Sequence, residues 1–244
     1  MQTYRAAGIA SAAALLFALT GCGGSDEHAG HDTPAASATG DKPSTPRKQL
    51  ILSAAEFPAG TQFANLSSEQ LSAGLTEASK ALDNATFTPA ECGQASKDSS
   101  GAVSNIAATA TIAAAVDPKS NGTYSEFIGD TALDLNKIHA AATGNCANIS
   151  AALSSQGQPI TVKLRFEPSP VPDAVKSLNA AEYLETTEYV APGKPPITKQ
   201  ALRGYAIVRG YTVGVLAQAG SAPLDRAAFN LLFLKAIQKV QNAK

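Results

Sequence analysis

The stretch YAIVRGYTVGVLA, residues 205–217, decides the fold of this chain. It holds two apolar runs, residues 205–208 and 211–217, with Arg209 and Gly210 between them. Two such runs joined by a two-residue turn are typical of a β-hairpin, and a glycine in the turn accepts the positive φ that this geometry needs. The sequence therefore predicts an antiparallel pair of strands near the C-terminus.

Two further strand patterns lie upstream of this hairpin. Residues 160–166 alternate apolar side chains with Thr161, Lys163 and Arg165, and prolines follow them. This alternation predicts a strand with one face in water. Residues 183–190 predict another strand.

Helices are predicted before and after these strands. Residues 224–240 place apolar side chains on one stripe at helical spacing. Ser67 and Gln70 form a capping-box pair, and apolar residues recur at helical spacing from there to Asp83. A short helix is predicted over residues 131–142. Residues 103–116 mix alanine, which favours helix, with isoleucine, threonine and valine, which favour a strand, and we interpret them as a strand.

The order of these elements indicates the fold class. Adjacent strands joined by short turns, with helices early and late, are typical of an α+β domain. We expect a single domain over residues 49–244, with a mainly antiparallel sheet packed by an early and a C-terminal helix. Because 19 Lys and Arg stand against 20 Asp and Glu, for a formal net charge of −1, nucleic acid is not an expected partner.

The N-terminus has the layout of an export signal. A positive charge at Arg5 precedes an apolar run, and small residues lead up to Cys22. The run is about half of the ~20 residues that a membrane-spanning helix needs. The residues Leu19-Thr20-Gly21-Cys22 resemble the lipobox of bacterial lipoproteins, which implies removal of residues 1–21 as a signal peptide and lipid on the Cys22 thiol. The alternative is an ordinary secretory signal that Cys22 happens to follow.

Residues 22–48 are rich in small residues, proline and charge, and predict a lipidated N-terminus with a flexible linker. This linker contains imidazole and carboxylate groups, which together suit zinc, copper or nickel. The candidate metal ligands are His28 and His31, with Asp26, Glu27 and Asp32. The alternative is that a hydrophilic linker contains such residues by composition alone. We expect no resident cofactor.

The cysteines predict one disulfide. If Cys22 carries lipid, Cys92 and Cys146 remain as an even pair in an oxidising compartment. A disulfide between them would stabilise the fold by about 4 kcal/mol on the chain-entropy model. Two buried free thiols are the alternative.

Candidate catalytic residues each have a simpler interpretation. His139 is the histidine within the expected domain, on a predicted helix, and no Gly-x-Ser-x-Gly motif accompanies it. Glu182, Glu185 and Glu188 suggest the paired acids of glycoside hydrolysis, but on a strand Glu185 faces away from the other two. We interpret these glutamates as charges on solvated positions. The sequence therefore predicts no catalytic residues and no enzyme.

Three segments resemble a known family: Leu50-Ile51-Leu52-Ser53, Pro89-Ala90-Glu91-Cys92, and the hairpin at 205–217 with the helix after it. From about Leu50 onward the chain resembles actinobacterial extracellular sensor-type domains, found on PknH-type receptor kinases and as free-standing lipoproteins. The resemblance implies an antiparallel sheet backed by helices and a cleft for an envelope ligand. The kinase domains carry more than one disulfide, whereas this chain offers Cys92 and Cys146.

These observations favour a non-enzymatic ligand-binding or sensor-type module, anchored by lipid on the extracytoplasmic side of the cell membrane. Its partner would be an envelope small molecule, lipid or protein. One alternative is a cell-envelope lipid carrier, with an apolar pocket lined by the alanine-rich residues 107–115. Another is a metal-binding envelope protein that uses His28 and His31.

Overall fold

The computed structural model describes residues 41–64, 80, 82–94, 96, 109–155 and 158–244. The predicted signal peptide, the lipobox, the His28 and His31 cluster and most of the helix predicted from Ser67 lie outside these residues. No helix in the described part of the chain is long and apolar enough to cross a membrane.

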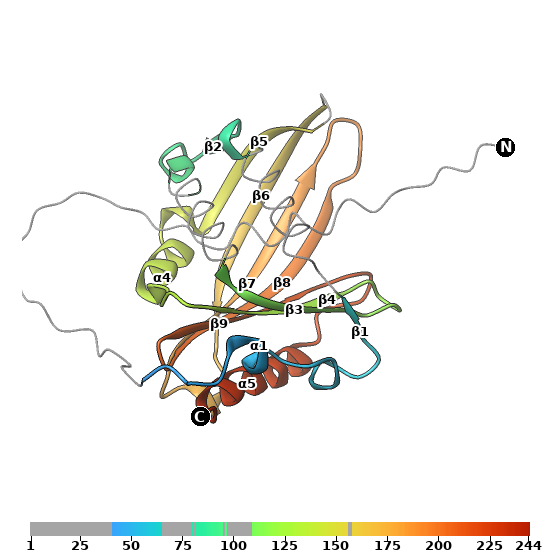
Figure 1. The fold of residues 1–244 in the computed structure, drawn as a ribbon. Coiled ribbons are helices and arrows are strands. Elements are labelled where there is room, and N and C mark those ends of the chain that lie inside the picture. The colour runs from blue at the N-terminus through green and yellow to red at the C-terminus, as the bar shows by residue number, and fades with distance from the viewer. Residues whose placement is uncertain (1–40, 65–79, 81, 95, 97–108, 156–157) are drawn as a thin grey trace, which may run out of the picture.

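The described residues build one nine-stranded sheet, and every neighbouring pair of strands is antiparallel. The order across the sheet is β1 (Gln62–Ala64), β3 (Thr111–Val116), β4 (Thr123–Gly129), β9 (Tyr211–Gln218), β8 (Ile197–Val208), β7 (Asn179–Val190), β6 (Gln158–Ser169), β5 (Asn148–Ser155) and β2 (Thr86–Thr88). Figure 1 shows that the sheet bends, with β3 and β4 running across the lower half of the view and β5 and β6 rising above them. The α+β class and the single antiparallel sheet are confirmed.

The hairpin predicted over residues 205–217 lies at the centre of this sheet. β8 and β9 pair directly, with Val208 opposite Tyr211. Arg209 and Gly210 have positive φ values of 49° and 76°, which a type I′ turn requires at both central positions. This prediction is confirmed, although β8 begins earlier, at Ile197.

The helices include α1 (Arg47–Leu50), α4 (Leu135–Thr143) and α5 (Arg226–Gln241), with short 3₁₀ turns η2 (Ala54–Glu56), η3 (Asn145–Ala147) and η4 (Asp173–Val175). Residues 82–83 and 91–94 are also helical. The predicted C-terminal helix is confirmed as α5. The Asp225 side chain caps it by accepting a hydrogen bond from the Ala228 backbone N–H. The stripe that it buries is Phe229, Leu232, Phe233, Ala236, Ile237 and Val240.

The two faces of the sheet carry separate cores. On one face, α5 and the segment containing Leu50 and Leu52 pack against β4, β8 and β9. On the other face, Leu135 and Ile138 of α4 pack over side chains of β6 and β7. Figure 1 shows α5 below the lower half of the sheet and α4 beside its upper half. The helix predicted over residues 131–142 is thus confirmed, with its N-cap at Asp134.

Cys92 and Cys146 form a disulfide in the structure. Both residues are buried with Phe87 and Ile149 in a third apolar cluster. The bond links the segment after β2 to the turn before β5, so it fastens the edge strand to the body of the sheet.

Other elements refine or correct the sequence predictions. β3 confirms the strand interpretation for residues 111–116, while residues 103–108 lie outside the described part. The sequence did not predict β4 or β5. Residues at the end of the predicted linker contact the domain, since Arg47 pairs with Asp130 at 2.9 Å and the Thr45 backbone N–H donates to the Lys244 carbonyl.

Candidate functional site

A hollow of about 560 Å³ lies on the sheet where β2, β5, β6 and β7 run side by side. We call it the polar hollow. It opens on the α5 face, since Thr186 and Glu188 lie an even number of residues after Glu182 on β7 and so share its face, and Glu182 pairs with Arg226 of α5. α5 itself packs on β8 and β9, so the hollow lies on a neighbouring part of the same face, over β5, β6 and β7. Its lining residues are Thr88, Pro89, Asn148, Ile149, Ser150, Lys163, Leu164, Arg165, Thr186 and Glu188.

Polar side chains cross the polar hollow in two adjacent rows, which the register of the strands sets. In the first row Ser150 lies opposite Lys163, and Lys163 lies opposite Glu188. In the second row Asn148 lies opposite Arg165, and Arg165 lies opposite Thr186. Side chains of one face repeat every second residue along a strand. The wet face that the alternation at residues 160–166 predicted is therefore the β6 part of this hollow.

The two cationic side chains of the polar hollow, Lys163 and Arg165, each form an ion pair with a glutamate. Lys163 Nζ lies 2.7 Å from Glu188 Oε1, and Arg165 Nη2 lies 3.0 Å from Glu167 Oε2. The Lys163 and Arg165 side chains are both 56% exposed. Exposed pairs of this kind contribute about 0–1 kcal/mol, so they can open at little cost when another anion arrives.

One hydroxyl of the polar hollow is buried without a hydrogen-bond partner. Thr186 Oγ1 has this property in the structure, and Thr186 lies directly opposite Arg165. A buried hydroxyl that makes no hydrogen bond is costly. It is a donor and acceptor that a bound molecule can use.

The structure corrects the interpretation of two of the three glutamates, while Glu188 is partly exposed, with a side chain 35% accessible. Glu182 and Glu185 are only 2% and 3% exposed, so they are not charges on solvated positions. Glu182 Oε1 pairs with Arg226 at 2.6 Å and accepts a hydrogen bond from Ser169. Desolvation raises the pKa of Glu182, although Ser169 and Arg226 act in the opposite direction. The prediction that Glu185 faces away from Glu182 agrees with the structure.

Glu185 belongs to a buried polar cluster on the α4 face. Arg203 donates to Glu185 Oε2 through Nε at 2.7 Å, and Thr187 donates to Glu185 Oε1 at 3.0 Å. Desolvation opposes the charge of Arg203, but Glu185 and Tyr205 raise its pKa above the usual value. Beside them, desolvation raises the pKa of Tyr183 to about 12, and its hydroxyl is buried without a partner.

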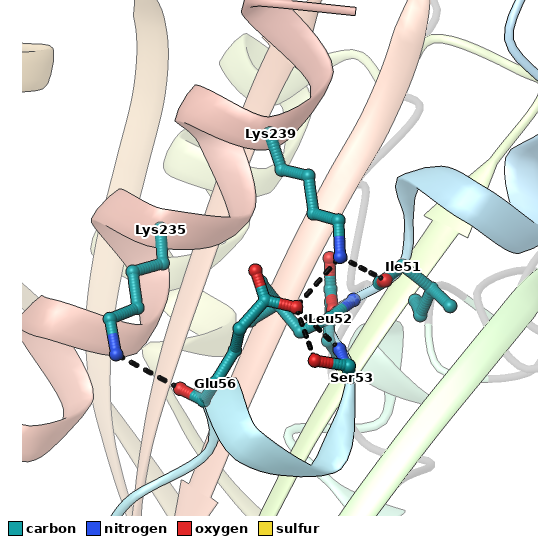
Figure 2. Close-up of polar contacts among 7 residues, drawn as sticks. Ile51, Leu52, Ser53, Glu56, Lys235 and Lys239 are labelled. Atoms are coloured by element: carbon teal, nitrogen blue, oxygen red, sulfur yellow. Dashed lines mark hydrogen bonds and ion pairs between the residues drawn. The ribbon is translucent and has the colours of Figure 1, made fainter.

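Residues 41–57, which we call the strap, pack against α5. Figure 2 shows Ile51, Ser53 and Glu56 of the strap beside Lys235 and Lys239 of α5. Lys239 donates to the Ile51 carbonyl at 2.9 Å and pairs with Glu56 at 2.7 Å. Lys235 donates to the Glu56 carbonyl, and Glu56 accepts hydrogen bonds from the backbone N–H and the hydroxyl of Ser53. Desolvation works against ionisation of Glu56, yet Lys239 and Ser53 lower its pKa to about 2.

The strap also covers a buried acid on β4. Glu126 is 1% exposed, and its Oε2 accepts a hydrogen bond from the Leu52 backbone N–H at 2.7 Å. Its other carboxyl oxygen is buried without a partner. Burial raises the pKa of Glu126 to about 8, against the opposing effect of the Leu52 hydrogen bond and Lys239. The strap is thus part of the core.

Of the residues that the sequence singled out, Glu188 lines the polar hollow, whereas His139 does not. His139 lies on the exposed side of α4, and its backbone carbonyl accepts a hydrogen bond from Thr143. Cys22, His28 and His31 lie outside the described residues, within which no cluster of three or more metal-ligand side chains occurs. Of the lining residues, Asn148 and Ser150 were missed because β5 was not predicted.

Neither protein-family models nor curated proteins give a match to this chain. Among solved structures, the extracellular domain of PknH from Mycobacterium tuberculosis is similar, with 16% sequence identity and a TM-score of 0.44. The match covers 82% of this chain and 98% of that domain.

Proposed function

We propose that this chain is a non-enzymatic ligand-binding module of sensor type, anchored through lipid on Cys22 to the extracytoplasmic side of the cell membrane. The observation that carries the proposal is the polar hollow. A hollow of about 560 Å³ lies in the range of roughly 300–1,000 Å³ that is typical of small-molecule sites. Its cationic and hydroxyl side chains suit a polar molecule, and Pro89, Ile149 and Leu164 add apolar surface between them.

The lining residues favour binding over chemistry. Lys163 and Glu188, which line the hollow, are paired with one another, and the lining residues that the structure describes include neither histidine nor cysteine. Catalysis by proton transfer needs an acid or base within hydrogen-bond reach of the reacting group of the substrate. The strongly perturbed Glu126 lies instead under the strap, where it holds Leu52.

The anchor in this proposal rests on the lipobox at 19–22 and on the linker that follows it. The structure supports a consistent layout, since the linker leads to Asp41, whose carbonyl accepts a hydrogen bond from Arg209 at the β8–β9 turn. The polar hollow lies near the other end of β8, beside residues 198–200. About ten residues of strand separate the two, or roughly 30 Å. In this layout the ligand site lies far from the point where the anchor joins the domain.

Mass spectrometry of the full chain, purified from membranes of its own host, tests the proposal. The expected mature chain begins at Cys22 with two acyl chains on a glyceryl thioether, and Cys22→Ser abolishes both the lipid and the cleavage. A native spectrum should also show a small polar molecule that is lost from the Arg165→Gln variant. An unlipidated chain would overturn the anchor. A retained acyl lipid or metal would overturn the polar ligand in favour of a lipid carrier or a metal-binding protein.

A further inference from the structure

Lys163 and Arg165 place two cations side by side in the polar hollow. They follow one another on the same face of β6, so their attachment points are roughly 7 Å apart. Glu188 is the one carboxylate among the described lining residues, because Glu167, the partner of Arg165, is not part of the lining. The lining therefore carries more positive than negative charge.

Arg165 has donors to spare for an anion. Its ion pair with Glu167 is made through Nη2, and a guanidinium carries five N–H donors in a planar fork. Such a fork binds a carboxylate or a phosphate through two parallel hydrogen bonds. Arg165 is thus the group in the hollow best suited to fix an anionic substituent.

Hydroxyl and amide groups surround the two cations. Thr88, Ser150 and Asn148 line the hollow, and Thr186 Oγ1 is buried without a partner opposite Arg165. Hydroxyls donate and accept at once, as the hydroxyls of a sugar do. No aromatic side chain is present among the described lining residues, so charge and hydrogen bonds, and not stacking, would provide the recognition.

We infer that the polar hollow binds an acidic saccharide, that is, a sugar ring that bears a carboxylate or a phosphate. Arg165 and Lys163 bind the anionic group, and Thr186, Ser150 and Asn148 bind the ring hydroxyls. This inference rests on the proposed ligand-binding function and names the class of ligand. Carboxylate and phosphate share the same recognition chemistry, so the experiment has an arm for each.

Calorimetric titration of the full chain in detergent micelles provides the test. The carboxylate arm compares digalacturonic acid with neutral digalactose, and the phosphate arm compares glucose 6-phosphate with glucose. We expect at least one acidic probe to bind, at least about tenfold more tightly than its neutral partner, because charge-assisted hydrogen bonds are lost with the anion. The affinity should fall as salt is raised, since the cations are exposed. The arm with the higher affinity identifies the source of the charge.

Variants distinguish binding in the hollow from nonspecific attraction of the acidic probe to surface cations and from misfolding. Arg165→Gln should weaken binding of the acidic probe at least about tenfold, and Lys176→Gln, an exposed cation paired with Asp173 outside the hollow, should leave it unchanged. Glu188→Gln should tighten binding, because it frees Lys163 and removes a negative charge from the lining. A gain of affinity cannot arise from misfolding.

Equal affinity for acidic and neutral probes, or no binding of the acidic probes at millimolar concentration, would overturn the inference. So would an Arg165→Gln variant that binds the acidic probe as tightly as the parent chain. If the native spectrum then shows a different polar molecule that Arg165→Gln loses, the ligand-binding function stands and only the ligand class fails. If neither titration nor the native spectrum finds a ligand, both fail.

Discussion

The backbone N–H of Leu52 donates a 2.7 Å hydrogen bond to Glu126 Oε2 inside the domain, where both residues are only 1% exposed. This contact fixes the strap to β4, while Lys239 of α5 donates a hydrogen bond to the neighbouring Ile51 carbonyl of the strap. A segment that comes directly after a predicted linker thus contributes to the main core. The charge state of Glu126 therefore matters for the stability of the whole domain.

The first prediction concerns this carboxyl and pH. Burial raises the pKa of Glu126 from 4.5 to about 8, so between these values the folded chain keeps a proton that the unfolded chain has released. Because the unfolded state binds fewer protons, stability must fall as pH rises through this window, by on the order of 3–5 kcal/mol in total. Glu126→Gln should remove this dependence, as measured by urea unfolding between pH 5 and 8.

The comparison variant for this experiment is Glu188→Gln, whose carboxyl lies at the surface of the polar hollow. It should keep the parent slope of stability against pH. If Glu126→Gln and the parent chain show the same slope, the carboxyl is ionised in the folded state throughout the window and the prediction is wrong.

The second prediction concerns how much the polar contacts between α5 and the strap contribute to stability. Lys239→Met removes a hydrogen bond to the Ile51 carbonyl and an ion pair with Glu56. Both partners are partly exposed, so we expect a loss of about 1–2 kcal/mol in the free energy of unfolding. Lys235→Met, which removes a single 3.2 Å hydrogen bond to the Glu56 carbonyl, should lose less. Equal losses for the two variants would show that the ion pair with Glu56 contributes nothing.

Strong periodicity explains the parts of the fold that could be predicted. The turn at Arg209 and Gly210 and the apolar stripe of α5 are local patterns, and the structure confirms both. β5 was missed because alanine and serine make up most of it, and β4 because Glu126 occupies a core position in it. In both strands, tertiary contacts that the local sequence does not show decide the structure.

The site was harder to predict because it combines residues from distant parts of the chain. The partner that makes burial of Glu185 possible is Arg203, 18 residues later, and for Glu182 it is Arg226, 44 residues later. Without that pairing, solvent exposure was the reasonable expectation for both acids. The polar hollow likewise depends on the register of β5 against β6, and β5 was not predicted.

The third prediction concerns the packing of Gly214 on β9. A Cβ at this position would lie 2.0 Å from Cε1 of Phe127, which sits opposite on β4. The Phe127 ring also packs against Tyr205 at 6.4 Å between centroids, so it cannot move freely. Gly214→Ala should lower the free energy of unfolding by at least about 1–3 kcal/mol, as measured by urea unfolding.

A second substitution checks that the clash is the cause. Phe127→Leu shortens the side chain, so in the double variant the methyl group of Ala at position 214 has room. The two losses should then be less than additive. Strict additivity would mean that Gly214 is required for a reason other than the ring of Phe127.

The last prediction concerns the buried pair of Glu185 and Arg203, each with a side chain 4% exposed. Removal of one partner leaves the other as an uncompensated buried charge, so Arg203→Met or Glu185→Leu should each lose about 3–5 kcal/mol of unfolding free energy. Replacement of both by apolar residues removes the unpaired charge, and the double variant should recover most of this loss. The cost that remains includes that of the Thr187 hydroxyl, which loses its acceptor on Glu185, and that of Tyr205, which loses its hydrogen bond with Arg203. A double variant as unstable as the sum of the two singles would mean that Glu185 and Arg203 stabilise the sheet through partners other than each other.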